Sequence, residues 1–399
     1  MREPGPWRTA KLREIATIYS GGTPSRDTPA FWGGDIPWLT PGELSGGEQA
    51  VTTQTQDRLT DAGLRSSGAV LMPPGSLLVT TRATLGACTI AGVPMATNQG
   101  FKNLVFNTDV ADPHFYRYLI ARMGQELARR ASGTTFLEIS GREFGDITVD
   151  VPPIHEQRGI VDVLDSVNDS GRAIQATIAK KQVMLSAFVQ AKFSAPTEAW
   201  VALGTVADVS GGVTLGRAIP EGASVELPYL RVANVQDGYF DCSEMKHVRI
   251  LQSEISRYSL EPGDLVLTEG GDFDKLGRGS VWDGRIYPCL HQNHLFRIRC
   301  GERINPHYLA LYTSSTQGRA YFLSVAKQTT NLATINSSQV KAMPVPCPSL
   351  EEQNKVVAAA QVIKEQIYAA QTEQEKLHAL KQGITDDLLT GRVCFHDLP

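Results

Sequence analysis

Two long stretches of the chain repeat apolar residues at helical spacing. No proline interrupts residues 155–193, and Pro196 then ends the run. Alternating steps of four and three residues meet Ile160, Leu164, Val167, Gly171, Ile174, Ile178, Lys181, Leu185, Phe188 and Lys192. The same steps near the C-terminus meet Val356, Ala360, Ile363, Ile367, Ala370, Gln374, Leu377, Lys381, Ile384 and Leu388. Mostly apolar positions over more than three heptads predict two long helices that pack as a coiled coil.

The ends of both predicted helices carry recognisable signals. Pro152 and Pro153 suit a first helical turn, where a missing N–H costs nothing. Ser349 and Glu352 have the spacing of a capping box. Gly391 is suited to stop the second helix. The two helices are therefore expected within residues 151–196 and 349–399.

The segments before each helix have a different pattern. Short β-branched runs alternate with glycine and proline turns, and long helical periods are rare. This pattern predicts mixed α/β (α+β) domains. The expected order is a first globular domain at 1–150, a helix at 151–196, a second globular domain at 197–348 and a helix at 349–399.

The two globular segments and their helices repeat one another. "WRTAKLREIATIYSGG" from Trp7 matches "WVALGTVADVSGG" from Trp200, and "PPGSLLVTTR" matches "EPGDLVLTEG". "DPHFYRYLI" matches "NPHYLALYT", and the helix entries "VPPIHEQ" and "CPSLEEQ" correspond. The chain is therefore a duplicated module of about 150 residues, each copy followed by a helix.

A long amphipathic helix needs a partner for its apolar stripe. The simplest partner for each helix is the other one. Antiparallel packing would relate the two modules by an approximate two-fold axis, which suits a nearly two-fold object such as duplex DNA. The alternative, two helices buried against a globular core, agrees less well with their many polar residues outside the seam.

Composition limits the possible functions. Hydrophobic residues make up 42% and charged residues 20%, as in ordinary globular proteins. The formal net charge of −4 argues against a purely electrostatic DNA binder. No stretch is apolar enough to span a membrane, and the N-terminus lacks the apolar region of a secretory signal. Six scattered cysteines without a CxxC pair favour the cytoplasm.

Common catalytic and metal-binding motifs are absent from the sequence. There is no GxxxxGK[ST] phosphate loop, no HExxH or CxxC metal motif and no GxSxG nucleophile elbow. The two histidines of "HQNH" at 291–294 lack a third ligand nearby and are interpreted as ordinary polar residues. The pattern favours a recognition protein without catalytic residues or a metal site.

The combination of two α/β modules, each followed by "VPPIHEQ" or "CPSLEEQ" and a long helix, resembles the specificity subunits of type I restriction–modification enzymes. The opening "LREIATIYSGGTPSRDTPAFWGGDIPWLTPGEL" and the ending "LKQGITDDLLTGRV" are also similar to that family. The second module departs from it, because "SGGVTLGR" replaces "SGGTPSRD" and the "WGG" element is missing.

The resemblance implies a function and partners. Each target-recognition domain would read one half of a bipartite site in double-stranded DNA, and the helices would set the spacer. Two modification (methyltransferase) subunits would bring S-adenosylmethionine, and motor–nuclease restriction subunits would use ATP and magnesium. No cofactor is expected on this chain.

Base recognition favours Arg for guanine and Asn or Gln for adenine, carried by loops on a rigid scaffold. Candidate DNA-binding residues of the first module are Thr23, Ser25, Arg26, Arg82, Gln99, Lys102, Thr134 and Arg142. Those of the second are Arg217, Arg231, Asn234, Lys275, Arg278, Gln292, Asn293, Lys327, Thr330 and Asn331.

Three alternatives remain open at the level of sequence. The chain could be the specificity subunit of a type II system with a fused methyltransferase–nuclease. It could be an enzyme whose duplicated domains form a carbohydrate or nucleotide site. It could also be a scaffold or dimerisation rod that binds no DNA.

Overall fold

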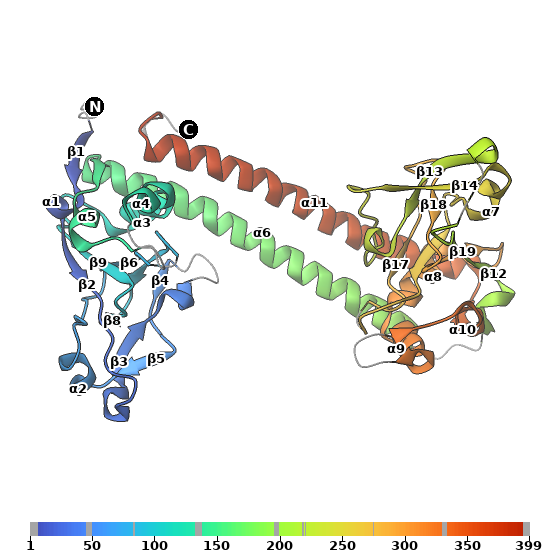
Figure 1. Cartoon of the computed structure of the whole chain (residues 1–399), viewed down its shortest axis with the longest axis horizontal. Helices are drawn as coiled ribbons and strands as arrows, with labels where there is room; N and C mark the ends of the chain where they lie inside the picture. Colours follow the sequence, from blue (N-terminus) through green and yellow to red (C-terminus); the bar gives the residue numbers. More distant parts are fainter. Residues whose placement is uncertain are drawn as a thin grey trace. The chain divides into compact units, whose positions relative to one another are not determined.

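The computed structural model describes residues 7–44, 50–82, 84–131, 138–194, 199–217, 219, 221–273, 275–328 and 333–393. The chain divides into two compact units (Figure 1). Unit 1 comprises Met1–Ala173 and Gln374–Pro399, and unit 2 comprises Ile174–Glu373. Each unit contains one α/β domain together with a part of each long helix.

Unit 1 is built around a five-stranded sheet in the order β2-β9-β6-β7-β4, with a three-stranded sheet β5-β3-β8 beside it in the described residues. The strands of the larger sheet are β2 (Ala16–Ser20), β4 (Val51–Thr52), β6 (Leu77–Thr80), β7 (Cys88–Ala91) and β9 (Phe101–Phe106). The smaller sheet holds β3 (Trp32–Leu39), β5 (Asp57–Leu59) and β8 (Ala96–Thr97), and β1 (Arg8–Lys11) pairs with β10 (Thr148–Val151). Short helices are α1 (Leu12–Ile15), α2 (Asp61–Arg65), α3 (Pro113–Arg122), α4 (Gly124–Arg130) and α5 (Gly141–Gly145).

Unit 2 repeats this plan. Its four-stranded sheet β12-β19-β15-β17 holds β12 (Ala207–Gly211), β15 (Leu265–Thr268), β17 (Gly279–Val281) and β19 (Leu295–Cys300). A second sheet holds β13 (Ser224–Leu230), β14 (Lys246–Leu251) and β18 (Leu290–His291), and a third holds β16 (Gly270–Gly271), β20 (Lys327–Gln328) and β21 (Ala333–Thr334). β11 (Trp200–Ala202) pairs with β22 (Pro344–Pro346); the short helices are α7 (Ile255–Tyr258), α8 (Pro306–Ser314), α9 (Thr316–Val325) and α10 (Ser337–Ala342).

The two long helices are α6 (Ile154–Ser194, 41 residues) and α11 (Leu350–Leu389, 40 residues). In unit 1, a Cβ on Gly171 of α6 would lie 3.7 Å from Leu377 of α11, and the earlier Leu164 shares a core with the later Leu388. In unit 2, Lys181 donates to Gln366 at 2.7 Å. Residue numbers rise along one helix as they fall along the other, so the helices are antiparallel within each unit.

The predicted seam is confirmed along almost its whole length. Each of its positions on α11 is buried or partly buried, and so is each on α6 up to Phe188. The prediction is wrong at Lys192, because this side chain is exposed. Val189 and Phe193 are buried in its place and join the core of the second domain. The apolar stripe of α6 therefore turns from the partner helix toward the globular domain near the end of the helix.

The glutamine of each helix entry ties the helix to its domain. Gln157 Oε1 accepts from the backbone N–H of Asp112 at 2.8 Å, and its Nε2 donates to the carbonyls of Val110 and Pro152, both at 2.8 Å. Gln353 Oε1 accepts from the N–H of Asn305 at 2.8 Å, and its Nε2 donates to Arg303 O at 3.0 Å and Pro348 O at 2.8 Å. Both side chains are fully buried. The repeated "EQ" of the sequence thus marks the same set of three hydrogen bonds in both units. We call each set, made by Gln157 or Gln353, the glutamine latch.

The helix ends follow the predicted signals with one difference. Ser349 and Glu352 form the capping box, with Glu352 N to Ser349 Oγ at 3.3 Å and Ser349 N to Glu352 Oε2 at 3.2 Å. Gly391 has φ +68° just after α11. Pro152 and Pro153 precede the first turn of α6 instead of forming it, and Pro153 O accepts from the N–H of Gln157 at 3.0 Å. Among the described residues, no helix is both long and apolar enough to cross a membrane.

Candidate nucleic-acid interface

In unit 1, four loop segments meet where β2, β6 and β9 approach one another. The "first loop cluster" consists of residues 21–26, 81–82, 98–102 and 138–142. The N–H of Gly22 donates to Thr97 O at 2.9 Å, Thr81 N to Gly100 O at 2.8 Å and Ile139 N to Thr81 O at 3.2 Å. A Cβ on Gly21 would lie 1.9 Å from Asn98 O, so only glycine permits this close approach.

Polar side chains of the first loop cluster face one another. Thr23 Oγ1 is hydrogen-bonded to Gln99 Oε1, and both residues are exposed. Lys102 is 4% exposed and its Nζ lies 3.9 Å from Glu138 Oε1. Burial lowers the pKa of Lys102, and the nearby Glu138 carboxylate partly opposes this change.

Two arginines border this lysine. Arg82 pairs with Glu138 through an antiparallel β-bridge, and its Cβ lies 3.6 Å from the Cβ position of Gly100. Arg142 is exposed in the short helix α5, next to Gly141, whose Cβ position is 3.9 Å from Lys102 Cε. The structure therefore brings five predicted residues to one place: Thr23, Arg82, Gln99, Lys102 and Arg142.

Ser25 and Arg26 belong to the same loop but lie over two tryptophans. The Arg26 guanidinium is 3.9 Å from the ring centroid of Trp32, and its NH2 is 2.7 Å from Asp57 Oδ2. The Trp32 indole donates to Ser25 O at 3.0 Å, and Trp38 donates to Gly22 O at 2.9 Å. Ring stacking and an ion pair thus hold an exposed guanidinium in a fixed orientation.

Unit 2 builds an equivalent frame from other residues. Its "second loop cluster" consists of residues 212–214, 269–278, 292–294 and 327–335, without the undescribed 274 and 329–332. Val213 N donates to His291 O at 2.8 Å, Glu269 N to His294 O at 3.0 Å and Ile335 N to Glu269 O at 2.9 Å. A Cβ on Gly212 would lie 2.0 Å from His291 O. These contacts reproduce those of Gly22, Thr81, Ile139 and Gly21.

The side chains of the second loop cluster differ from those of the first. His294 Nδ1 lies 2.7 Å from Glu269 Oε2, where the first cluster has Gly100 and Thr81. Lys275 is paired with Asp272, and Arg278 has a buried Nε without a hydrogen-bond partner among the described residues. Lys327 is exposed on β20, which pairs with β21. Gln292 and Asn293 form the turn between β18 and β19 and are half-buried.

Three candidates of the second module lie outside this cluster. Arg217 makes two contacts of 2.9 Å with the Glu254 carboxylate and holds the pKa of Glu254 below its usual value. Arg231 bonds Glu244. Asn234 is 3% exposed, and its amide accepts from Arg231 N and donates to the carbonyls of Asp241 and Glu244. The Asn234 side chain therefore serves the backbone of its own loop.

Some residues could not be anticipated or placed. Thr134, Thr330 and Asn331 lie outside the described residues. Glu138, Glu269 and His294 lie in the loop clusters but were not among the predicted residues. Aligning "TNQG" at 97–100 with "HQNH" at 291–294 would have marked His294, because it takes the place of Gly100. Within the described part of the chain, no group of three or more His, Cys, Asp and Glu side chains is placed to hold a metal ion.

Comparison with known proteins gives a consistent family. Residues 4–181 match the family model "Type I restriction modification DNA specificity domain". The chain is 31% identical over 167 residues to the type I restriction enzyme MjaIX specificity subunit of Methanocaldococcus jannaschii, a match covering 42% of this chain and 39% of that protein. The chain thus spans about two fifths of the length of the first curated relatives it matches.

Solved structures agree over nearly the whole chain. A chain from a study of complex assembly and conformational transition of the type I R-M system has a TM-score of 0.61 at 18% identity, covering 98% of this chain and 99% of that one. The type I restriction-modification system S subunit from M. genitalium has a TM-score of 0.54 at 13% identity, covering 98% and 97%. At these identities the likeness concerns the fold.

Proposed function

We propose that this chain, which is similar to type I restriction–modification specificity subunits, is a DNA sequence-specificity subunit whose two domains each read one half of a bipartite site. One observation carries the proposal. The two loop clusters share a backbone frame but differ in nearly every side chain placed on it. The same backbone frame carrying different side chains suits two domains that each recognise a different short DNA sequence.

The side chains have the chemistry that base recognition requires. Gln99 and Asn293 stand at equivalent turns, and amide side chains can bond an adenine edge through two hydrogen bonds. Arg82 and Arg142 in one cluster, and Lys275, Arg278 and Lys327 in the other, supply cations for phosphates or guanine. We infer that the net charge of −4 is compatible with DNA binding because these cations gather at the loops.

The helices are proposed to fix the spacer and to dock the modification subunits. In unit 2 they expose five large apolar side chains outside the seam: Val183, Met184, Leu350, Val362 and Tyr368. Exposed apolar groups on a helix pair favour a protein partner. S-adenosylmethionine is proposed to bind the modification subunits, and ATP and magnesium the restriction subunits, so that this chain contributes recognition and no catalytic group.

Mapping methylated adenines tests this function directly. The chain is expressed with its modification subunits in a host without other adenine methylation, and the methylated motif is read from the genome. We expect a motif of two short halves separated by a fixed gap. Gln99→Ala should relax one half and Asn293→Ala the other, while the exposed helix variant Gln371→Ala leaves the motif intact. A continuous motif, or relaxation of both halves by one variant, would contradict the proposal.

A further inference from the structure

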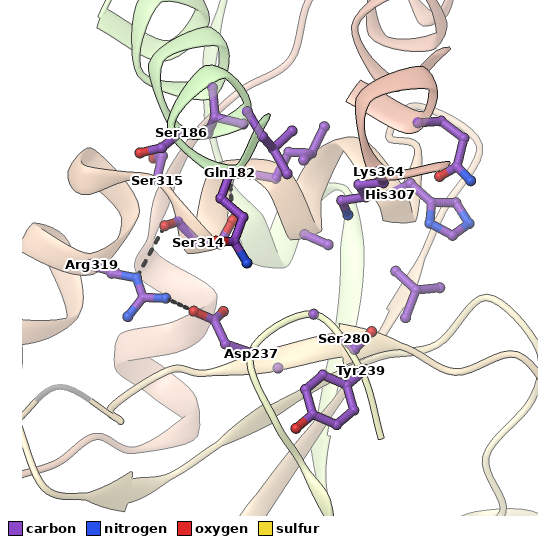
Figure 2. Close-up of a pocket in the computed structure, with 18 of the residues that line it drawn as sticks. Gln182, Ser186, Asp237, Tyr239, Ser280, His307, Ser314, Ser315, Arg319 and Lys364 are labelled. Carbon is purple, nitrogen blue, oxygen red and sulfur yellow. Dashed lines mark hydrogen bonds and ion pairs between the residues drawn. The ribbon is translucent and has the colours of Figure 1, made fainter. Parts of the chain in front are cut away.

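A pocket of about 720 Å³ opens in unit 2 where α6 and α11 meet the globular domain (Figure 2). Its walls come from α6, α11, the helices α8 and α9, the loop at 237–240, strand β17 and the residues that follow it up to 285. Its volume lies in the range of small-molecule sites, about 300–1,000 Å³. None of the candidate DNA-binding residues lines this pocket, and Leu185 is the one predicted seam position among its lining residues.

The duplication shows what fills the corresponding place in unit 1. Tyr118 stands six residues after the N-cap Asp112, and Asp165 and Asn168 stand eight and eleven residues after Gln157. The Tyr118 hydroxyl donates to Asp165 and accepts from Asn168 Nδ2 at 2.6 Å. A buried arginine, Arg117, lies 3.7 Å from the same carboxylate. In unit 1, therefore, the chain's own Asp165 carboxylate lies at the contact between α6 and α3.

Of four equivalent positions of unit 2, three carry shorter or neutral side chains and the fourth carries a lysine. Counting from Asn305, Leu311 replaces Tyr118 and Ser315 replaces Arg122, which pairs with Asp386 in unit 1. Counting from Gln353, Gln361 replaces Asp165 and Lys364 replaces Asn168. The four replacements Leu311, Ser315, Gln361 and Lys364 all line the pocket. Ala310 and Gln190, which also line the pocket, stand at the positions of Arg117 and Asp386. Both ion pairs and the aromatic ring of unit 1 are therefore missing, and Lys364 stands there as a new cation.

This cation has no ionic partner within the described residues. Lys364 reaches into the pocket beside His307 (Figure 2) and forms no ion pair there. The other charges nearby are already matched: Arg319 pairs with Asp237, and Arg285 with Asp283 at 2.6 Å. Lys364 and His307 are both exposed at the mouth of the pocket, so their surroundings desolvate them only in part. This partial burial lowers the pKa of Lys364, although Asp237 opposes the change, and partial burial and then the Lys364 charge lower the pKa of His307. An anion beside these two groups would relieve the unfavourable electrostatics.

Apolar groups form one part of the lining, beside polar residues such as Gln182, Ser186 and Gln190. Val189, Phe240 and Leu311 are less than 9% exposed, and Leu185 and Val281 are half-buried. The pocket thus combines one apolar wall with one cationic corner, the arrangement that suits a small organic acid. We propose that this pocket binds a small organic anion whose carboxylate lies between Lys364 and His307 and whose apolar body packs against Leu311 and Val189.

The test compares a charged probe with its neutral counterpart. Benzoate and benzamide have the same ring and nearly the same size, and each is titrated into the full chain by saturation-transfer NMR. Benzoate should bind and benzamide should bind at least about tenfold more weakly, because a hydrogen bond to a charged group contributes more than a neutral one. Equal signals from both probes, or no benzoate signal at millimolar concentration, would overturn the proposal.

Two substitutions locate the binding. Lys364→Gln should weaken benzoate about tenfold and leave benzamide unchanged, whereas Lys355→Gln should change neither probe. Lys355 is the matched control because it lies on the same helix, exposed and paired with Glu351. Leu311→Tyr installs the unit 1 side chain and should abolish binding by filling the pocket. Undiminished benzoate binding by Lys364→Gln, or retained binding by Leu311→Tyr, with an unchanged melting temperature, would contradict this site. Neither probe involves DNA, so the result is independent of the proposed function.

Discussion

Units 1 and 2 keep the same hydrogen-bonded scaffold and differ in what the scaffold carries. The glutamine latch, the Asx-capped helices α3 and α8, and the backbone contacts of the loop clusters occur in both units. The side chains of the loops differ between the two units, and so do the residues where the long helices contact the domain. The comparison separates what holds the module together from what gives each copy its own chemistry.

The largest expected effect concerns the latch. Gln157→Ala or Gln353→Ala removes three hydrogen bonds and leaves buried backbone groups unsatisfied, so each should lower the free energy of unfolding by about 3–5 kcal/mol. Chemical denaturation monitored separately for each unit measures the loss. The exposed Gln371→Ala is the control, with an expected change below about 0.5 kcal/mol. A small loss for only one of the two would show that the latches are not equivalent.

A smaller effect concerns a buried histidine that only unit 2 has at this place. His291 takes the position of Thr97, its Nδ1 lies 3.0 Å from Tyr258 O, and burial lowers its pKa from 6.5 to about 4. Between these values the unfolded chain binds more protons, so stability is complete above pH 6.5 and falls as the pH falls. From pH 7 to pH 5 this group should cost unit 2 about 2 kcal/mol.

His291→Thr provides the comparison for that pH dependence. The variant installs the residue of unit 1 and should lose about 2 kcal/mol less than the original chain between pH 7 and pH 5. Denaturant titrations at both pH values measure the difference, and the other titrating groups cancel between the two proteins. Identical pH dependence in the two chains would mean that His291 is not buried in its neutral form.

The smallest expected effect concerns the helix seam in unit 1. A Cβ on Gly171 would meet Leu377 Cδ2 at 3.7 Å, an ordinary contact, so Gly171→Ala fits. The alanine should raise the melting temperature, because it adds about 1 kcal/mol of helix propensity. The exposed Gly383→Ala has nothing within 4 Å and should give a similar gain. Destabilisation by Gly171→Ala alone would show that the two helices pack more closely than described.

Periodicity predicted the long helices well because their stripe is buried at a regular spacing. The register failed only at Lys192, where the domain core replaces the partner helix as the apolar surface. Matching "SGG" with "SGG" was also wrong by one residue. Ser20 pairs with Lys102, whereas Gly211 and not Ser210 pairs with the equivalent Phe296. An alignment of short identical motifs can be wrong by one residue, because the pairing of the strands determines which glycine lies at the turn.

The candidate interface was predictable in outline only. Loop position led to the prediction of Gln99 and Lys102, which the structure places in one loop cluster with three other candidates. It was not enough to exclude Asn234, whose amide bonds its own loop, because such a bond depends on tertiary folding. The pocket of unit 2 could not be foreseen either, since it depends on how replacements near α8 and on α11 come together in the fold.

Domain exchange tests the central claim most directly. Residues 1–150 are replaced by the corresponding domain of another specificity subunit, and the methylated adenines are mapped before and after. The account predicts that one half of the motif changes while the other half and the gap stay the same. An unchanged motif, or a change in both halves, would contradict the claim that each unit reads its own half-site.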